Sequence, residues 1–276
     1  MPPGAVDTHV HVFDPARFPF DPSTAYQPLP HECGTPADLA RMLDAHGIDR
    51  VVLVNPTSGY GFDVRCLVHA LRTLGPRARG ITRAPLAVDR RALRALSARG
   101  VIGVRLDLLA EPVTAASLAA VAALLRRLAD AGMLLDIQCE GDQLVPLAPL
   151  LREIPVRVVV DHLGRPVPER GVRQPGFATL LALADTGRVA VKLSGAMRCS
   201  RQPPPHPDVD RYVAALARHY GPERLVWGSD WPFLRSPWRV DYAPLLVQLA
   251  RWFPRAADRR RILADTPGGW FGFARD

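Results

Sequence analysis

Lysine is almost missing from this sequence. Lys192 is the only one, so arginine supplies nearly all of the positive charge behind a formal net charge of +8 at pH 7. The arginines are scattered in helix-like stretches such as Arg90-Arg91 and Arg126-Arg127, and no basic run is interleaved with aromatic residues. That distribution argues against a nucleic-acid partner, because nucleic-acid surfaces gather their cations in one patch or stripe. The excess of positive charge fits a small anionic partner better.

Cysteine is scarce too, and long apolar runs are absent. The four cysteines are far apart and include no Cys-x-x-Cys pair, which predicts ordinary thiols in a reducing compartment. No charged start followed by an apolar segment opens the chain, and no 18 consecutive residues are apolar. These features predict a cytoplasmic protein with no signal peptide and no membrane partner.

What the sequence does contain is a regular alternation of short apolar segments and longer helical ones. At 276 residues and 48% hydrophobic content, one domain covering residues 1–276 can bury a substantial core. We expect strands at 5–13, 50–55, 79–84, 101–107, 133–139, 156–162, 189–194 and 224–230. We expect helices at 36–46, 63–74, 89–98, 115–131, 143–153, 177–186, 208–220, 242–252 and 256–264, the first with Thr35 as its N-cap.

Eight strands alternating with helices predict an α/β protein with a parallel sheet. At this length the simplest closure is a single (β/α)8 TIM barrel. An open doubly wound sheet is the alternative, but no Gly-x-Gly-x-x-Gly loop follows the first strand. In a TIM barrel the active site lies at the carboxyl ends of the strands, so polar residues at those ends are the candidates for function.

The first strand carries a pair of histidines. Its apolar and polar residues alternate, so His9 and His11 should project to the same side, with Asp7 on that side one step earlier. Two neighbouring imidazoles can bind a divalent metal or exchange protons around a carbonyl oxygen. Closure of the barrel would bring Asp230, at the end of the last strand, beside this pair. A carboxylate next to imidazoles is suited to activating water.

Polar residues also end several other predicted strands. They are Arg105, Asp107, Gln138, Glu140, Asp161, His162, Lys192 and Ser194. Each candidate has a structural alternative: His162 could bond a carbonyl group, and Asp230 could cap the helix that follows it. Arg105 and Lys192 could pair with structural carboxylates. The concentration of such groups at one rim favours a functional site over these separate explanations.

Three segments are similar to those of a known family. They are Val6-Asp7-Thr8-His9-Val10-His11, Val160-Asp161-His162-Leu163-Gly164-Arg165-Pro166 and Trp227-Gly228-Ser229-Asp230-Trp231-Pro232. Together they resemble the amidohydrolase superfamily, specifically its amidohydrolase-2 branch, and within it the 2-pyrone-4,6-dicarboxylate lactonases. The segment Arg17–Pro22, Tyr26 and Lys192-Leu193-Ser194 support the likeness, which covers nearly the whole chain.

The resemblance implies hydrolysis of a small carboxylated lactone. Asp230 would act as general base on water, while His9, His11 and His162 would polarise the ring carbonyl. The residues that would bind the substrate are Arg105 and Arg198, which would pair with a carboxylate, and Tyr26, Tyr60 and Gln138, which would line the pocket.

The sequence also departs from the family pattern. Metal-dependent members carry a lysine or glutamate on strand four, or a histidine on strand five, where this chain has Arg105 and Gln138. The resemblance therefore implies no required cofactor, although His9, His11, His162 and Asp230 could together hold a divalent metal. No second arginine closely follows Arg105, and Gln138 stands where the lactonases have an aromatic residue, which weakens the case for a pyrone diacid as substrate.

Several alternatives stay open from the sequence. The same residues could serve a sugar-acid lactonase or a galactarolactone isomerase. A zinc-dependent hydrolase or decarboxylase is a further possibility, and a non-catalytic barrel that binds a ligand is the last. The sequence is also compatible with a homo-oligomer.

Overall fold

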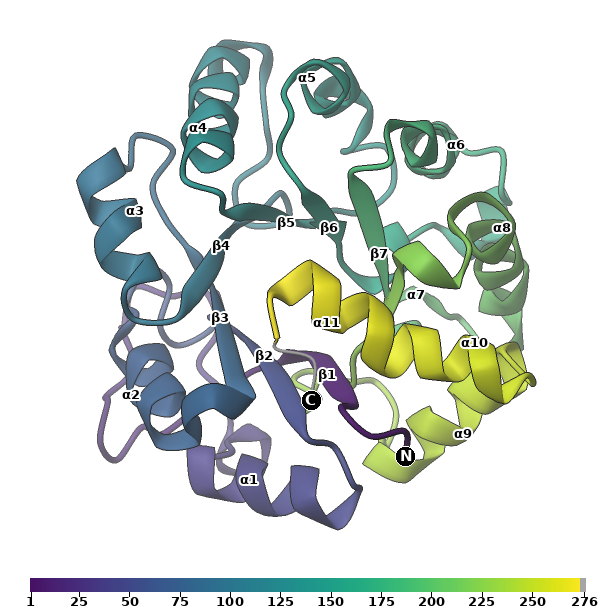
Figure 1. The fold of residues 1–276 in the computed structure, drawn as a ribbon, viewed down its shortest axis with the longest axis horizontal. Helices are drawn as coiled ribbons and strands as arrows, with labels where there is room; N and C mark the ends of the chain where they lie inside the picture. The colour runs from purple at the N-terminus through teal and green to yellow at the C-terminus, as the bar shows by residue number, and fades with distance from the viewer. Residues whose placement is uncertain (274–276) are drawn as a thin grey trace.

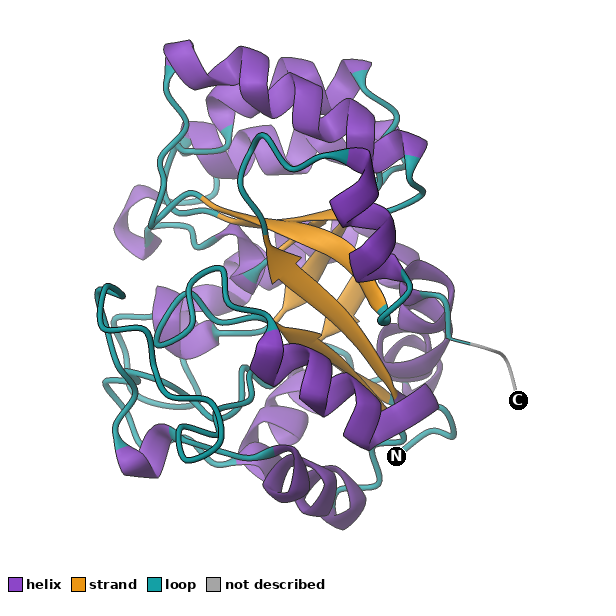
Figure 2. Ribbon diagram, turned by 90° about the vertical axis from the view of Figure 1, so that its left-hand side faces the viewer, coloured by secondary structure: helices purple, strands orange, loops and turns teal. Residues whose placement is uncertain are grey.

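Eight parallel strands run in sequence order around a nearly closed barrel, with helices packed outside them (Figures 1 and 2). This computed structural model describes residues 1–273, so the last three residues of the expected 1–276 domain lie outside that range. The predicted (β/α)8 TIM barrel is confirmed.

The strands occur where the apolar segments predicted them. They are β1 (Val6–Val10), β2 (Arg50–Val54), β3 (Ala78–Arg83), β4 (Val101–Asp107), β5 (Leu134–Gln138), β6 (Val158–Val160), β7 (Val189–Leu193) and β8 (Leu225–Trp227). The prediction was too long at several carboxyl ends: β1 stops at Val10, β6 at Val160 and β8 at Trp227. His11, His162 and Asp230 therefore lie just beyond the carboxyl ends of β1, β6 and β8, at the rim where a TIM barrel carries its active site.

Helices follow the strands in turn. They are α1 (Pro36–Ala45), α2 (Arg65–Leu74), α3 (Arg90–Ser97), α4 (Leu118–Asp130), α5 (Ala148–Glu153), α6 (Pro175–Leu183), α7 (Ala196–Cys199), α8 (Asp210–Tyr220), α9 (Tyr242–Trp252), α10 (Ala256–Arg260) and α11 (Thr266–Phe271). Thr35 caps α1 as predicted, since its hydroxyl accepts a hydrogen bond from the Asp38 amide at 3.2 Å. None of the helices within residues 1–273 is long and apolar enough to cross a bilayer.

Two predicted helices differ most from their expected extent. The segment 143–153 begins with a 3-10 turn, and α5 starts only at Ala148, because Pro146 and Pro149 lack the N–H groups that a continuous α-helix needs. The segment 256–264 is α10 followed by a π-helical stretch, Arg261–Asp265, which leads into α11, a helix that the sequence pattern did not reveal.

The hydrophobic core has two layers. The larger layer lies between the strands and the surrounding helices. The smaller one fills the interior of the barrel, where Val6, Val52, Leu134 and Val226 pack together with Phe271 of α11. In Figure 1, α11 (yellow) lies across the centre of the barrel. Apolar side chains therefore fill the barrel interior at the end that α11 covers, and polar groups are left to the opposite end.

A β-bulge in β1 corrects one sequence prediction. Asp7 pairs with Val51 of β2, but Val10 pairs with Leu53, so β1 contains one residue more than β2 over this stretch. A bulge of this kind reverses which face the following side chains occupy. Strict alternation placed Asp7 on the side of His9, and this was wrong: the Asp7 carboxylate is bonded to Tyr242 of α9, whereas His9 contacts Asp161.

Asp7 connects the first strand of the barrel with the segment that follows the last strand. Its Oδ1 accepts hydrogen bonds from the backbone amides of His9 at 3.1 Å and Ser229 at 3.0 Å, and its Oδ2 accepts from the Tyr242 hydroxyl at 2.9 Å. Gly228 passes so close to β1 that a Cβ there would lie 2.7 Å from the Cβ of His9. These contacts align the segment that carries Asp230 with the segment that carries the paired histidines.

Replacing Asp7 should therefore destabilise the fold according to how many acceptors are lost. Asp7→Ala leaves three buried donors without a partner, and we expect it to lower the free energy of unfolding by about 3–5 kcal/mol. Asp7→Asn keeps an oxygen for the two amides, and we expect it to cost about 1 kcal/mol. Urea denaturation followed by circular dichroism measures both, and equal losses in the two variants would contradict this role.

Candidate active site

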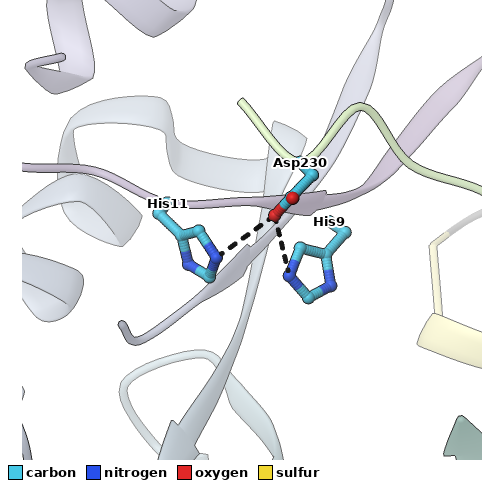
Figure 3. Close-up of side chains that lie close together, drawn as sticks. All are labelled: His9, His11 and Asp230. Carbon is cyan, nitrogen blue, oxygen red and sulfur yellow. Dashed lines mark ion pairs between the residues drawn. The ribbon is translucent and has the colours of Figure 1, made fainter. Parts of the chain in front are cut away.

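Asp230 stands among three imidazoles at the carboxyl end of the barrel. Its Oδ1 lies 3.7 Å from His9 Nε2, 3.6 Å from His11 Nε2 and 3.9 Å from His162 Nε2. Figure 3 shows His9 of β1 and His11, just after β1, both facing the same carboxylate oxygen of Asp230. The expected meeting of the late aspartate with the early histidine pair is confirmed. Asp230 and His162 have φ angles of +65° and +50°, a left-handed backbone that is strained for such side chains and is frequent at functional sites.

The charge states of these groups follow from burial and from one arginine. Burial holds the pKa of His9 well below its usual 6.5 and lowers the pKa of His162 to about 3, so both rings are neutral near pH 7. Burial alone would raise the pKa of Asp230, but the Arg198 guanidinium outweighs it and holds that pKa well below its usual range. The site therefore presents an ionised carboxylate to the neutral imidazoles of His9 and His162.

Each histidine is oriented by a different partner at Nδ1. His11 Nδ1 lies 2.7 Å from the carbonyl oxygen of Val54, and His162 Nδ1 lies 2.9 Å from Ser194 Oγ. His9 Nδ1 is 3.2 Å from both Asp161 Oδ1 and Lys192 Nζ. All three rings thus turn their Nε2 atoms toward Asp230.

A layer of buried charges lies behind His9. Arg105 Nη2 donates to Asp161 Oδ2 at 2.5 Å, and Lys192 Nζ lies 2.5 Å from Asp136 Oδ2 and 2.9 Å from Asp161 Oδ1. Lys192, Arg105 and His9 offset the burial of Asp161 and hold its pKa well below the usual value, whereas burial and the nearby Asp161 raise the pKa of Asp136 to about 7. Two cations and two carboxyl groups compensate one another beneath the reaction centre.

A cavity of about 530 Å³ opens above this centre. Among its lining residues are His11, His162 and Asp230, and the predicted binding residues Tyr26, Arg105, Gln138 and Arg198 also line it. Arg105 and Arg198 are already paired, Arg105 with Asp161 and Arg198 with Asp230 through Nε at 2.5 Å. Their role is therefore to orient buried carboxylates as well as to present charge to the cavity.

Tyr60 lies elsewhere. Its side chain is 1% exposed and stacks on Phe13 with ring centroids 5.9 Å apart, and its hydroxyl accepts a hydrogen bond from the Asp14 amide at 3.0 Å. It supports the loop after β1 rather than facing the cavity described here. We therefore leave Tyr60 out of the substrate-binding set.

Four charged residues of the cavity were absent from the predicted binding set. They are Asp107, Arg165, Arg201 and Arg235. Arg165 belongs to the segment Val160–Pro166 that carries the family likeness, so its motif was a usable signal. Arg235 follows Asp230 on an irregular loop and lies over the Tyr26 ring at 5.0 Å, a contact between residues far apart in sequence that no local pattern reveals.

Comparisons with known proteins agree with this geometry. The chain is 34% identical to 4-sulfomuconolactone hydrolase of Rhizobium radiobacter over 99% of this chain and 91% of that protein. It is 31% identical to 2-pyrone-4,6-dicarbaxylate hydrolase of Comamonas testosteroni (97% and 90% covered). It is 30% identical to D-galactarolactone isomerase of Agrobacterium fabrum (98% and 92% covered).

Solved structures show the same barrel. A probable 2-pyrone-4,6-dicarboxylic acid hydrolase of Acinetobacter baumannii, with citric acid bound, superposes with a TM-score of 0.89 at 25% identity, covering 98% of this chain and all of that one. A putative hydrolase of the same kind from Pseudomonas putida gives 0.87 at 32% identity, with 99% of each chain covered. The family model for amidohydrolases matches residues 6–273, and the chain belongs to the amidohydrolase family.

Proposed function

We propose that this enzyme hydrolyses a small carboxylated lactone to the open-chain hydroxy acid. The observation that carries the proposal is the Asp230 carboxylate, ionised and surrounded by three imidazole Nε2 atoms at the base of an arginine-lined cavity. A base beside several groups that can bond an oxygen is the arrangement that acyl transfer to water requires. The similarity to two named lactone hydrolases over nearly the whole chain supports it.

The cavity favours an anionic substrate. Five arginines line it against two carboxylates, Asp107 and Asp230. Arg165 Nε is buried without a hydrogen-bond partner among the described residues, and its Nη2 is 3.2 Å from Glu140. An arginine fork with a free donor is suited to a carboxylate or sulfonate oxygen. We assign Arg165 to substrate binding, next to the predicted Arg105 and Arg198.

The reaction needs one proton to be taken up and returned. Asp230 accepts a proton from water as the water oxygen attacks the lactone carbonyl carbon. The tetrahedral oxyanion that forms is held by hydrogen bonds from the imidazoles of His9 and His162, which cost no reorganisation because their partners already orient them. When the bond from the carbonyl carbon to the ring oxygen breaks, Asp230 returns the proton to that oxygen and is an ionised carboxylate again.

A divalent metal fits this site poorly. Ligand atoms of His9, His11 and Asp230 lie within 4.8 Å of one another, which is close enough for a single ion. Cations already contact two of these residues, however, because Lys192 Nζ is 3.2 Å from His9 Nδ1 and Arg198 Nε is 2.5 Å from Asp230 Oδ2. A doubly charged ion would be repelled by both, and we therefore propose hydrolysis without a metal.

Isomerisation of a sugar lactone is the second candidate. The relative from Agrobacterium fabrum, named D-galactarolactone isomerase, is 30% identical over 98% of this chain. Asp230 and the imidazoles could equally move a proton between two oxygens of a lactone without adding water. NMR of the product separates the two reactions, because hydrolysis yields an open-chain hydroxy acid and isomerisation yields a rearranged ring.

We also propose a cytoplasmic location. All four cysteines are free thiols, and three of them are buried. Burial raises the pKa values of Cys139 and Cys199 to about 12, so these thiols are unreactive near pH 7. Free thiols of this kind are usual in a reducing compartment.

Asp230→Asn should abolish most turnover while leaving the fold intact. We expect kcat to fall by about 10²–10⁴-fold with little change in KM, because the amide cannot take the proton from water. Asp130→Asn is the matched control, since Asp130 pairs with Arg90 on the surface, and it should keep full activity. Steady-state kinetics on a panel of lactones measures both, and an active Asp230→Asn enzyme of unchanged melting temperature would refute the assignment.

Arg165→Met should weaken binding of charged lactones only. We expect KM to rise by roughly 10–100-fold for a carboxylated lactone, the size of one hydrogen bond to a charged group. The methyl ester of the same substrate should show no such increase. Arg170→Met is the control, because Arg170 pairs with Asp142 outside the cavity. An equal increase for acid and ester would argue against a carboxylate contact.

Chelation should leave the activity unchanged. After dialysis against dipicolinate we expect the same kcat and KM, and elemental analysis of the purified protein should find far less than one divalent ion per chain. Loss of activity that returns when Zn²⁺ is added would contradict the metal-free mechanism.

A further inference from the structure

The only lysine of the chain is buried beneath the reaction centre. Lys192 lies on β7 with no exposed surface. Its Nζ lies 2.5 Å from Asp136 Oδ2, 2.9 Å from Asp161 Oδ1 and 3.2 Å from His9 Nδ1. Ordering and burying a lysine side chain is costly, so its contact with an imidazole of the site calls for an explanation beyond ion pairing.

The hydrogen bonds of the ammonium group decide which nitrogen of His9 carries the proton. An ammonium has three N–H donors and no lone pair. Asp136 Oδ2 accepts one hydrogen bond from it, Asp161 Oδ1 is in ion-pair contact at 2.9 Å, and His9 Nδ1 lies 3.2 Å away. His9 Nδ1 can be the third acceptor only if it carries a lone pair. The opposite tautomer would set an N–H of His9 against an N–H of Lys192 at 3.2 Å and leave one buried donor unpaired.

Two cations balance the charge of Asp161. Its Oδ2 accepts from Arg105 at 2.5 Å, and its Oδ1, which also lies 3.2 Å from His9 Nδ1, forms an ion pair with Lys192 Nζ at 2.9 Å. The His9 ring is neutral, so a lone pair at Nδ1 places its single proton at Nε2. Within the described residues Nε2 has no hydrogen-bond partner, and it lies 3.7 Å from Asp230 Oδ1. Its proton is therefore free for an oxygen that enters between the two residues.

His11 has the opposite arrangement. Its Nδ1 is 2.7 Å from the carbonyl oxygen of Val54, which can only accept a hydrogen bond, so Nδ1 carries a proton. When the ring is neutral, His11 Nε2 is a lone pair facing Asp230 at 3.6 Å. The two histidines of one motif thus offer a donor and an acceptor to the same small volume.

We propose that Lys192 is a positioning residue that holds His9 as its Nε2–H tautomer. In this state His9 donates a hydrogen bond to a substrate oxygen, and it has no Nε2 lone pair with which to bind a metal. The role toward substrate rests on the proposed lactone hydrolysis, but the tautomer itself does not. Without Lys192, His9 Nδ1 would carry the proton and donate it to Asp161, and Nε2 would become a metal ligand.

NMR of the intact protein labelled with [15N]histidine tests the tautomer directly. Long-range 1H–15N correlation distinguishes the two neutral tautomers, and the missing signals in His9→Asn identify His9 among the eight histidines. We expect Nε2–H in the wild type and Nδ1–H in Lys192→Met. Asp136→Asn is the control: it breaks a buried pair of Lys192 but keeps the contact with His9, so the Nε2–H state should remain. A wild-type His9 protonated at Nδ1 overturns the proposal, whatever the variants do.

Metal binding and kinetics provide a second readout. Calorimetric titration with Zn²⁺ should show binding to Lys192→Met at least about 10-fold tighter than to the wild type or Asp136→Asn. In Lys192→Met we expect kcat to fall by about 10²–10³-fold with little change in KM, the effect of losing one donor to an oxyanion. Equal zinc affinities in all three proteins would overturn the proposal. If NMR finds the Nε2–H tautomer of His9 but the protein hydrolyses no lactone, this inference stands and the proposed function is refuted.

Discussion

The alignment of β8 with β1 is the constraint on which the rest of the structure depends. The regular ladder does not close here; instead the amide of Asp230 donates to the His9 carbonyl at 2.9 Å and the amide of His11 donates to the Trp231 carbonyl at 2.8 Å. The Asp7 carboxylate ties both segments together from outside the barrel. Asp230 and the histidine pair are about 220 residues apart in the sequence. They become neighbours only through these hydrogen bonds between β1 and the segment after β8.

Electrostatic compensation explains how so many polar groups can be buried at one end of a barrel. Lys192 and Arg105 neutralise Asp136 and Asp161 beneath the histidines, and Arg198 neutralises Asp230 beside them. A buried carboxylate without such partners would take up a proton and cease to be a base. The arginines that line the cavity add positive charge. Carboxylates of the protein balance this charge only in part, so the site is suited to binding an anion.

Much of the site followed from local pattern together with one topological rule. The period of apolar residues predicted eight strands, and the TIM barrel rule put their carboxyl ends at one rim, which identified His162 and Asp230. The same logic failed at Asp7, because a bulge adds one residue to β1 and no sequence pattern announced it. The lactonase interpretation, in turn, placed Tyr60 at the pocket, although its ring stacks on Phe13 and its hydroxyl bonds the Asp14 amide instead.

The sequence by itself determined the class of fold, the histidine pair and the candidate for the general base, since each depends on residue type and on spacing within one strand or one repeat. Tertiary structure decided the neutral state of the His9 and His162 rings, the pairing of Lys192 and the shape of the cavity. These depend on distances of about 3 Å between side chains from different strands, and such distances are set by register, bulges and packing. The proposed tautomer of His9 is the clearest case, because it depends on a contact between residues 183 positions apart.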